Sequence, residues 1–499
     1  MLTSVAHHRE RLKVGDHPHF ISGKWIAGEG ESYEQIHPST NEVVAVFPEG
    51  DAEVVNAAVL SARKAFDEGP WPRMGARERK KILQKFVEAI SAEAEDLGYL
   101  QTLDNGLPIN FSLNTRVSAL TASDIFDHYA GWIDKINGET YPQYTDTVNL
   151  HYHTYREPVG VVGAILPWNA PMMMFALKVA PALATGCTVV LKPSELSGIC
   201  VNRLTRIVAE SDLPDGVFNL VNGGPATGRA IVEHPGVDKI TFTGSRAVGE
   251  WIMAEGAKTM KRVTLELGGK SAALIFPDAR SVETAAKTVM GLCSTFLSGQ
   301  VCSTQTRAIV HKSIVDDVLR YAREQVDTVK FGDPFDMATT SAPIISKRQA
   351  EKIMNYIRIG QEEGAELVFG GDCPGGDLSE GNWINPTLFA GVDNKMRIAQ
   401  EEIFGPVLSV ISFETEEEAI ALANDSIYGL AGGLYTADLS RAFRVAKKMK
   451  TGAVGINGYS VMPNSPAGGV KQSGLGREGG WSTIEAFTEL KTLMFNLDA

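Results

Sequence analysis

Two short stretches of the sequence carry side chains suited to covalent chemistry. Residues 296–302 read Phe-Leu-Ser-Gly-Gln-Val-Cys and place a thiol, Cys302, in a loop that contains a glycine. Residues 266–270 read Glu-Leu-Gly-Gly-Lys and place a carboxylate, Glu266, at the end of a β-rich run. A thiol attacks as its thiolate, and a carboxylate acts as a base near neutral pH when its surroundings raise its pKa. The two residues together indicate nucleophilic catalysis assisted by a general base.

Neither residue is sufficient alone. Cysteine is among the residue types most often buried as a small apolar side chain, and a lone glutamate at a strand end is more often a solvated charge. A third candidate, Asn169, follows a predicted strand in Pro167-Trp168-Asn169. Its amide can hydrogen-bond a developing oxyanion, and an Asx turn before Pro171 is the alternative interpretation.

Two segments are candidates for binding a dinucleotide. In Phe242-Thr243-Gly244-Ser245 a strand pattern ends, Gly244 turns and a helix begins at Ser245, so the helix N-terminus can face a pyrophosphate. In Lys192-Pro193-Ser194-Glu195, Lys192 can donate to ribose hydroxyls and Glu195 can accept from a free 2′-hydroxyl. A carboxylate there would repel the phosphate of NADP, which favours NAD. A Ser-capped helix and a solvated charged turn are the respective alternatives.

Two standard motifs match in letters only. Gly474, Gly476 and Gly479 fit G-x-G-x-x-G, but this run follows no strand of a βαβ unit. Gly269-Lys270-Ser271 resembles the end of a phosphate-binding loop, yet the earlier glycine of that motif is replaced by Thr264. Neither match is therefore interpreted as a nucleotide site.

The patterns around these residues predict the elements that position them. Continuous apolar strands separated by amphipathic helices indicate a doubly wound parallel sheet. Its strands are expected at 159–167, 187–192, 217–221, 239–242 and 263–267. A second α/β pattern covers residues 306–457, and a single helix is expected from Arg77 to Leu103. Thr147–Tyr155 and Leu490–Leu497 are typical of a protruding ribbon, whose unpaired edges favour pairing with another subunit.

Composition narrows the class of protein. The 499 residues carry a net charge of −13, which argues against nucleic acid or an anionic membrane as a partner. The five cysteines form no CxxC pattern, and no apolar run is long enough to span a membrane, so a reducing cytoplasm is expected. His151 and His153 share a strand face, but no third ligand is in view and no metal site is predicted.

A set of motifs in this chain resembles the aldehyde dehydrogenase superfamily, in that family's order. They are Pro167-Trp168-Asn169, Lys192-Pro193-Ser194-Glu195, Phe242-Thr243-Gly244-Ser245, Glu266-Leu267-Gly268-Gly269-Lys270, Gly299-Gln300-Val301-Cys302, Glu402-Ile403-Phe404-Gly405-Pro406 and residues 465–474, Ser-Pro-Ala-Gly-Gly-Val-Lys-Gln-Ser-Gly. The resemblance implies an α/β fold with a Rossmann-like cofactor domain, a second α/β catalytic domain and a small β oligomerisation ribbon. The resemblance implies an NAD-binding domain of residues 1–130 and 156–267 and a catalytic domain of residues 268–480. The oligomerisation ribbon would consist of residues 131–155 and 481–499.

The resemblance also implies roles for individual residues. Cys302 would be the nucleophile and Glu266 the general base, with Asn169 and the Cys302 N–H as oxyanion hole; Lys178 and Glu478 match positions used around Glu266, in a proton-relay path. The implied NAD contacts are Trp168, Lys192, Ser194, Glu195, Gly244, Ser245, Gly249, Leu267, Glu402 and Phe404.

The implied reaction is oxidation of an aldehyde to a carboxylic acid through a Cys302 thioester. Glu266 weakens the nearest competitor, a coenzyme-A-acylating semialdehyde dehydrogenase, because that reaction needs no activated water. A catalytically silent binding protein of the same fold is a second alternative, which the presence of both Cys302 and Glu266 disfavours. A cysteine hydrolase would need a histidine near Cys302, and no histidine lies in the loops expected there.

The resemblance places a substrate pocket that has few aromatic rings. Its residues are Ala170, Met173, Met174, Leu177, Phe296, Val301, Met462 and Ala467. Ala170, Leu177 and Ala467 stand where many relatives carry rings, which predicts a bulky apolar aldehyde, aromatic or medium-chain. Betaine aldehyde is disfavoured because its cation would need a cage of aromatic rings. Succinic semialdehyde is disfavoured because these positions include no arginine to bind a substrate carboxylate. The three methionines at 172–174 could instead fill the core, which is the alternative to their lining a substrate pocket.

Overall fold

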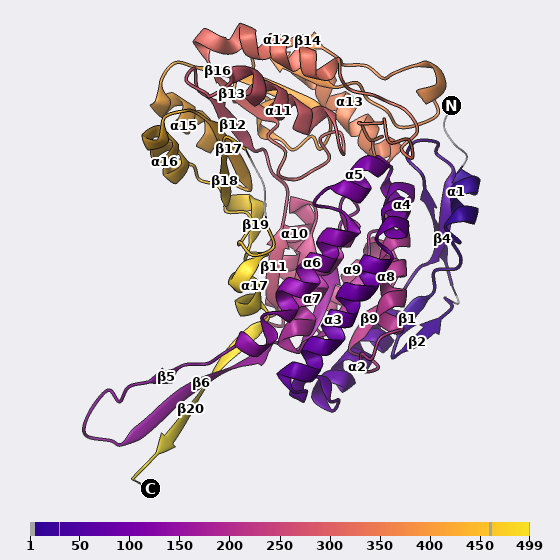
Figure 1. The fold of residues 1–499 in the computed structure, drawn as a ribbon, viewed down its shortest axis with the longest axis vertical. Coiled ribbons are helices and arrows are strands. Elements are labelled where there is room, and N and C mark those ends of the chain that lie inside the picture. The colour runs from indigo at the N-terminus through magenta and orange to yellow at the C-terminus, as the bar shows by residue number, and fades with distance from the viewer. Residues whose placement is uncertain (1–4, 29, 459–461, 499) are drawn as a thin grey trace.

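The computed structural model describes residues 5–28, 30–458 and 462–498. Two large sheets, each with helices on both faces, lie one above the other, and a narrow ribbon extends from the lower part (Figure 1). The two sheets and the ribbon have the α/β architecture that the sequence predicts.

The first sheet is doubly wound. Its strand order is β19 (Gly474–Leu475), β11 (Arg262–Glu266), β10 (Lys239–Thr243), β7 (Val161–Ile165), β8 (Thr188–Lys192), β9 (Phe218–Leu220), β1 (His19–Ile21) and β2 (Lys24–Ile26). The five strands from β11 to β9 are parallel, and the edge strands are antiparallel. From β7 the chain runs outward through β8 and β9, then returns to add β10 and β11 on the other side. Ligands of such sheets bind beyond the carboxyl ends at this switch point.

Helices cover both faces of this sheet. α2 (Ala52–Asp67), α9 (Pro225–Glu233) and α10 (Arg246–Ala257) pack on one face. The other face is covered by α3 (Ala76–Ala92), α4 (Ala94–Asn105), α6 (Ala119–Ala130), α7 (Pro171–Thr185) and α8 (Ile199–Ala209). Their apolar residues recur at helical spacing and are buried, because a strand with two covered faces needs an apolar partner on each.

The single helix predicted from Arg77 to Leu103 is wrong. α3 ends at Ala92 and α4 begins at Ala94, because Glu93 leaves the helical region with φ −102° and ψ 12°. The Glu93 carboxylate accepts from Arg203 Nε of α8 at 2.6 Å. The bend directs α4 onto α8, and no glycine or proline marks this position in the sequence.

The second sheet is also mostly parallel. Its order is β14 (Glu366–Phe369), β15 (Thr387–Ala390), β16 (Val407–Phe413), β13 (Arg307–His311), β12 (Ala272–Ile275), β17 (Ala431–Tyr435) and β18 (Ala453–Ile456), and only β14 is antiparallel to its neighbour among these strands. α11 (Val282–Ser294) and α12 (Val315–Val326) cover one face. The other face is covered by α13 (Lys347–Glu362), α14 (Arg397–Gln400), α15 (Glu416–Asn424) and α16 (Leu439–Lys448).

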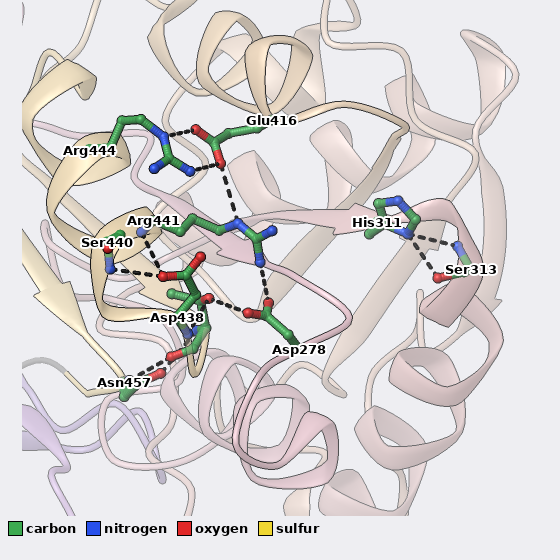
Figure 2. Close-up of polar contacts among 10 residues, drawn as sticks. Asp278, His311, Ser313, Glu416, Asp438, Ser440, Arg441, Arg444 and Asn457 are labelled. Carbon is green, nitrogen blue, oxygen red and sulfur yellow. Dashed lines mark hydrogen bonds and ion pairs between the residues drawn. The ribbon is translucent and has the colours of Figure 1, made fainter.

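A polar network joins the helices at the outer edge of this sheet (Figure 2). The Arg444 guanidinium donates to both carboxylate oxygens of Glu416, at 2.7 and 2.8 Å, and Arg441 lies between Glu416 and Asp278. Asp438 caps α16 by accepting from the backbone N–H groups of Ser440 and Arg441. The network fixes α16 against α15, beside β17 and β18 (Figure 1).

The ribbon is a third sheet made of β5 (Thr140–Tyr141), β6 (Leu150–Pro158) and β20 (Thr488–Asn496). β6 and β20 pair antiparallel from Leu150 with Asn496 to Pro158 with Thr488. Their exposed apolar side chains include Tyr155, Leu490 and Met494. The rings of His151 and His153 lie 5.5 Å apart, His153 bonds the Tyr155 hydroxyl, and the described residues contain no cluster of three metal-ligating side chains.

The remaining elements are short. They are α1 (Val5–Arg11), α5 (Ile109–Asn114), α17 (Gly480–Ala486), the hairpin β3 (Ser32–Ile36) with β4 (Val43–Pro48), and 3-10 turns at Trp71–Arg73, Ile133–Lys135, Lys312–Ile314, Gly376–Leu378 and Lys471–Ser473. Within the described ranges, no helix has the length and apolar character needed to cross a membrane.

Candidate active site

A cavity of about 1400 Å³ lies at the switch point of the first sheet and reaches the second α/β part. Cys302 and Glu266 both line it. The other predicted residues that line it are Asn169, Glu478, Trp168, Lys192, Ser194, Glu195, Gly244, Ser245, Leu267, Glu402, Phe404, Ala170, Met173, Met174, Leu177, Phe296, Val301, Met462 and Ala467. Lys178 and Gly249, which were also predicted, do not line the cavity themselves. The structure thus gathers around one space residues that are far apart in the chain.

The loop that carries Cys302 is held in a specific backbone conformation. Phe296 and Ser298 have positive φ values of 61° and 51°, and Gly299 has a φ of 73°. A Cβ atom on Gly299 would overlap the carbonyl oxygen of Gly405, so only glycine fits there. Strained backbone of this kind is typical of functional loops.

Buried Gln300 anchors the same loop, a role that the sequence analysis missed. Its Nε2 donates to the carbonyl oxygens of Leu297 and Pro343, at 2.9 and 3.1 Å. Its Oε1 accepts from the Ile345 N–H at 3.0 Å. All three bonds are to backbone groups, so the residue two positions before Cys302 is fixed to the body of the second part.

The surroundings of the Cys302 sulfur disfavour its anion in the protein alone. Burial raises the pKa of this thiol to about 12, and the carboxylates of Glu402 and Glu266 add to the rise. The positive charge of Arg116 acts in the opposite direction. A thiolate at neutral pH therefore requires a base or an additional positive charge in the cavity.

Asn169 links the first sheet to the nucleophile loop. It follows β7, and its side-chain Nδ2 donates to the backbone carbonyl of Gln300 at 3.0 Å. The preceding carbonyl, that of Trp168, accepts from Asn105 Nδ2 at 3.1 Å. These bonds hold the Asn169 amide beside Cys302 at the cavity wall.

Glu266 ends β11, between β10 and β19. Its Oε1 atom is buried and has no hydrogen-bond partner in the described part of the chain. Burial raises the pKa of this carboxyl well above its usual range, and the negative charge of Glu478 raises it further. Lys178 acts to lower it. A buried carboxyl with a raised pKa inside a cavity has the properties required of a general base.

Lys178 and Glu478 form a buried ion pair behind Glu266. Lys178, on α7, is fully buried, and its Nζ lies 2.6 Å from Glu478 Oε1. Thr241 of β10 completes the group, since its hydroxyl lies 3.3 Å from Lys178 Nζ. The two charges are therefore held in place by α7, β10 and the segment after β19.

A glycine brings the two catalytic segments into contact. A Cβ atom on Gly269 would lie 2.6 Å from the carbonyl oxygen of Cys302. The backbone after Glu266 thus passes directly against the backbone of Cys302. This explains why two residues separated by 35 intervening positions open onto the same space.

The predicted dinucleotide residues occupy the other end of the cavity. Gly244 N–H donates to the carbonyl of Glu266 at 3.0 Å, and Ser245 begins α10 without using its hydroxyl as a cap. Lys192 Nζ donates to the Pro193 carbonyl at 2.8 Å and lies 3.6 Å from Glu195. Gly249 does not line the cavity; a Cβ there would collide with Leu267, so this glycine allows Leu267 to pack against α10.

Glu402 and Phe404 enter from the second part. Glu402 Oε1 accepts from the Gly269 N–H at 3.0 Å, and burial raises the pKa of its carboxyl. Phe404 has a φ of 61°, and its ring meets the Trp168 ring edge-on at a centroid distance of 5.6 Å. The two parts of the protein therefore meet across the middle of the cavity.

The predicted substrate pocket surrounds an apolar cluster at the end of the cavity near Cys302. Met173, Met174, Phe296 and Val301 pack against it. Its buried members are Leu107, Val117, Ala170, Leu297 and Ala342. This end of the cavity is formed by aliphatic and methionine side chains, with Phe296 and Phe111 in edge-on contact at 5.5 Å.

The turn between α5 and α6 and the start of α6 also line the cavity, which the sequence analysis missed. The turn contributes Arg116 and Val117, and α6 contributes Thr121. The positions considered from the sequence contained no arginine, and the structure corrects this picture because Arg116 comes from outside every motif. Only the packing of α6 against α7 brings this turn to the cavity.

Comparisons with known proteins agree with this geometry. A model of the aldehyde dehydrogenase family matches residues 25–493. The chain belongs to the aldehyde dehydrogenase family. It is 43% identical over 481 residues to aldehyde dehydrogenase 1 of Tanacetum cinerariifolium, covering 95% of this chain and 94% of that protein. It is 39% identical to a mitochondrial benzaldehyde dehydrogenase of Antirrhinum majus, covering 95% and 88% of the two chains.

Solved structures give the same result. A betaine aldehyde dehydrogenase from Staphylococcus aureus, in complex with NAD⁺, superposes with a TM-score of 0.94 at 37% identity, covering 99% of this chain and 98% of that one. The family and the fold class predicted from the sequence are confirmed, as is the prediction that the protein is an enzyme of the aldehyde dehydrogenase class. The family is NAD(P)-dependent.

Proposed function

We propose that the protein oxidises an aldehyde to a carboxylic acid with NAD, through a thioester on Cys302. The observation that carries this proposal is that Cys302, Glu266 and the Gly244–Ser245 turn line one cavity. A thiol, a base and a site for a hydride acceptor are the three components that the reaction needs.

The residues at the sheet end of the cavity fit a dinucleotide. The Ser245 hydroxyl is free at the N-terminus of α10, where backbone N–H groups favour a phosphate. Lys192 and Glu195 would hold the ribose hydroxyls, and the Glu195 carboxylate favours NAD over NADP. Trp168, Ser194, Leu267, Glu402 and Phe404 complete the proposed contacts, with Gly249 acting by letting Leu267 pack. When bound, NAD supplies the hydride acceptor and a positive ring.

In the first half-reaction the Cys302 sulfur attacks the aldehyde carbon. The thiol must lose its proton, and Glu266 is the proposed acceptor because it lines the same cavity and its Oε1 has no hydrogen-bond partner among the described residues. The Asn169 amide and the Cys302 N–H stabilise the oxyanion, a contribution of about 3–4 kcal/mol for one donor. Loss of hydride from the thiohemiacetal leaves a thioester on Cys302.

In the second half-reaction Glu266 removes a proton from water, which attacks the thioester and releases the acid. The raised pKa of Glu266 suits a base that works near neutral pH. The buried Lys178–Glu478 pair provides a path for that proton away from Glu266. This role for Glu266 separates the proposal from a coenzyme-A-acylating enzyme, which needs no such water.

We further propose that the substrate has a bulky apolar body, aromatic or medium-chain. The support is the aliphatic wall of Ala170, Met173, Met174 and Leu177, with Phe296, Val301, Met462 and Ala467 around it. The relatives named above act on aldehydes as different as benzaldehyde and betaine aldehyde, so their names leave the choice open. An aromatic cage for a quaternary ammonium group is not formed by these side chains.

The protein is also proposed to be a homo-oligomer of the cytoplasm. The ribbon of β5, β6 and β20 exposes apolar side chains and free edges that suit pairing with a second copy. The five cysteines are all unpaired, as expected in a reducing compartment. The domain boundaries given in the sequence analysis remain a prediction.

The test is the near-ultraviolet absorbance of NADH formed from NAD and a panel of aldehydes. We expect the wild type to reduce NAD with benzaldehyde and octanal at higher kcat/KM than with acetaldehyde. Cys302→Ala should abolish the reaction, whereas Cys373→Ala, at an exposed cysteine, should keep it. No reduction of NAD would favour the silent binding protein, and a reaction dependent on coenzyme A would favour the acylating enzyme.

A further inference from the structure

Arg116 places a cation at the substrate end of the cavity. It lies in the turn between α5 and α6, and the next residue, Val117, is buried in the apolar cluster with Ala170 and Leu297. Arg116 itself lines the cavity that contains Cys302. Arg116 and Cys302 thus line the same space, and the positive charge of Arg116 acts to lower the pKa of the Cys302 thiol.

The backbone around Arg116 is fixed. Ser118 caps α6 by accepting from the Thr121 N–H, and the Ser118 N–H donates to the Thr115 carbonyl at 2.9 Å. The Thr115 hydroxyl donates to the Phe111 carbonyl at 2.8 Å. The turn is therefore anchored on both sides of residue 116, and the arginine side chain projects from a rigid base.

The guanidinium of Arg116 forms no ion pair with any residue that the structure describes. Among the residues that the structure describes, no hydrogen bond or ion pair is made by the half-buried Arg116 side chain. Two other cations of the cavity have contacts: Lys192 bonds the Pro193 carbonyl, and Arg229 lies over the Trp251 ring. A partly desolvated arginine without a partner, in a cavity that admits substrate, is a binding site for an anion.

We propose that Arg116 binds an anionic group at the far end of the substrate, so that the preferred aldehydes have an apolar body and a terminal carboxylate. This inference rests on the proposed function and narrows its substrate class. The aldehyde carbon lies at Cys302, the apolar body lies against Met173, Met174 and Phe296, and the carboxylate pairs with the guanidinium. Planar bidentate pairing with a carboxylate is the geometry that arginine provides best.

The first experiment compares 4-carboxybenzaldehyde with benzaldehyde, which differ by the carboxylate alone. For the wild type, kcat/KM should be higher for 4-carboxybenzaldehyde, and added NaCl should reduce this preference by raising KM. Arg116→Met should lower the preference roughly 10-fold, mainly through KM. Arg320→Met, an exposed arginine on α12, is the matched control and should leave the preference unchanged.

The outcomes separate the alternatives. If Arg116→Met lowers kcat/KM equally for both aldehydes, the arginine acts only on the sulfur and the proposal is overturned. The proposal is also overturned if Arg116→Met has the same kcat/KM as the wild type for both aldehydes. Arg116→Lys should restore part of the preference, because a positive charge returns without the planar fork.

The second experiment measures binding without turnover, so it remains decisive if neither aldehyde is oxidised. Calorimetry should show 4-carboxybenzaldehyde binding to Cys302→Ala roughly 10-fold more tightly than to Cys302→Ala with Arg116→Met. Equal affinities would overturn the assignment of Arg116. Failure of NAD reduction together with this tenfold difference would overturn the proposed reaction and leave the anion site supported.

Discussion

The Lys178 ammonium lies 2.6 Å from a carboxylate oxygen of Glu478, and this buried pair stands directly behind Glu266. Its two charges act on Glu266 in opposite directions: Glu478 raises the pKa of the Glu266 carboxyl, and Lys178 lowers it. Burial raises the pKa of Glu266 most, and the pair adjusts the pKa that results.

Substitutions in this pair should move the acidic limb of the rate profile in opposite directions. Lys178→Met removes the charge that lowers the Glu266 pKa, so the limb of kcat should move to higher pH by about one unit. Glu478→Gln removes the charge that raises it, so the limb should move to lower pH. Thr241→Val removes a hydrogen bond to Lys178 without changing a charge and is the control. If the acidic limbs of Lys178→Met and Glu478→Gln moved in the same direction, the assignment of this pair would be contradicted.

Glu266→Gln should separate the two half-reactions. The amide cannot accept a proton from water, so the thioester should accumulate after one hydride transfer. Stopped-flow measurements should show a burst of about one NADH per active site, slower than in the wild type because Glu266 is also the proposed acceptor of the thiol proton. The steady rate after the burst should fall further, roughly 10²–10⁴-fold. A proportional loss of burst and steady rate would show that Glu266 acts only in forming the thiolate.

Gly299→Ala tests whether the nucleophile loop needs its backbone conformation. Gly299 has a φ of 73°, and a methyl group there would meet the Gly405 carbonyl. We expect a loss of about 1–3 kcal/mol of stability and a fall in kcat of more than about 10²-fold, because displacement of the loop misplaces the sulfur. Gly375→Ala, at an open position with no neighbour within 4 Å, should change neither quantity.

His37 should make stability depend on pH. It is 1% exposed, and burial lowers its pKa to about 4. The unfolded chain therefore binds one more proton than the native protein between about pH 6.5 and pH 4, and the stabilisation present above pH 6.5 is lost as the pH falls through this window. The loss is about 1 kcal/mol per pH unit for this residue.

Urea unfolding at several pH values checks this contribution. His37→Gln should reduce the slope of unfolding free energy against pH by about that amount. Ser39→Ala removes the partner of His37 Nδ1, which lies 2.8 Å from Ser39 Oγ, without removing the titrating ring, so it should keep most of the slope. Equal slopes in the wild type and His37→Gln would contradict the prediction.

Much of the first sheet and the site could be predicted because their signals are local. The strands that deliver Asn169, Lys192, Gly244 and Glu266 are short apolar runs ended by turn residues, and parallel strands place their carboxyl ends on one edge. The nucleophile loop was recognisable from the glycine before Cys302. Composition and spacing alone did not decide between the functional and the structural interpretation of each motif. The resemblance to a known family favoured the functional one for all of them together.

The parts that escaped prediction depend on tertiary contacts. Arg116 belongs to no motif, and only the packing of α6 on α7 brings it to the cavity. The buried strands β12 and β17 are short apolar segments that local pattern does not distinguish from a helix. The break at Glu93 follows from its pairing with Arg203, which lies far along the chain.

The pairing of β6 with β20 joins segments more than three hundred positions apart. β19, Glu478 and β20 all lie beyond residue 473, so one late segment of the chain supplies the edge of the first sheet, the charge behind Glu266 and one strand of the ribbon. Cys302 therefore precedes Glu478 in the chain by more than a hundred and seventy positions, although both line one cavity. The proposed reaction therefore depends on the segment after residue 473 as well as on the segments that carry Cys302 and Glu266.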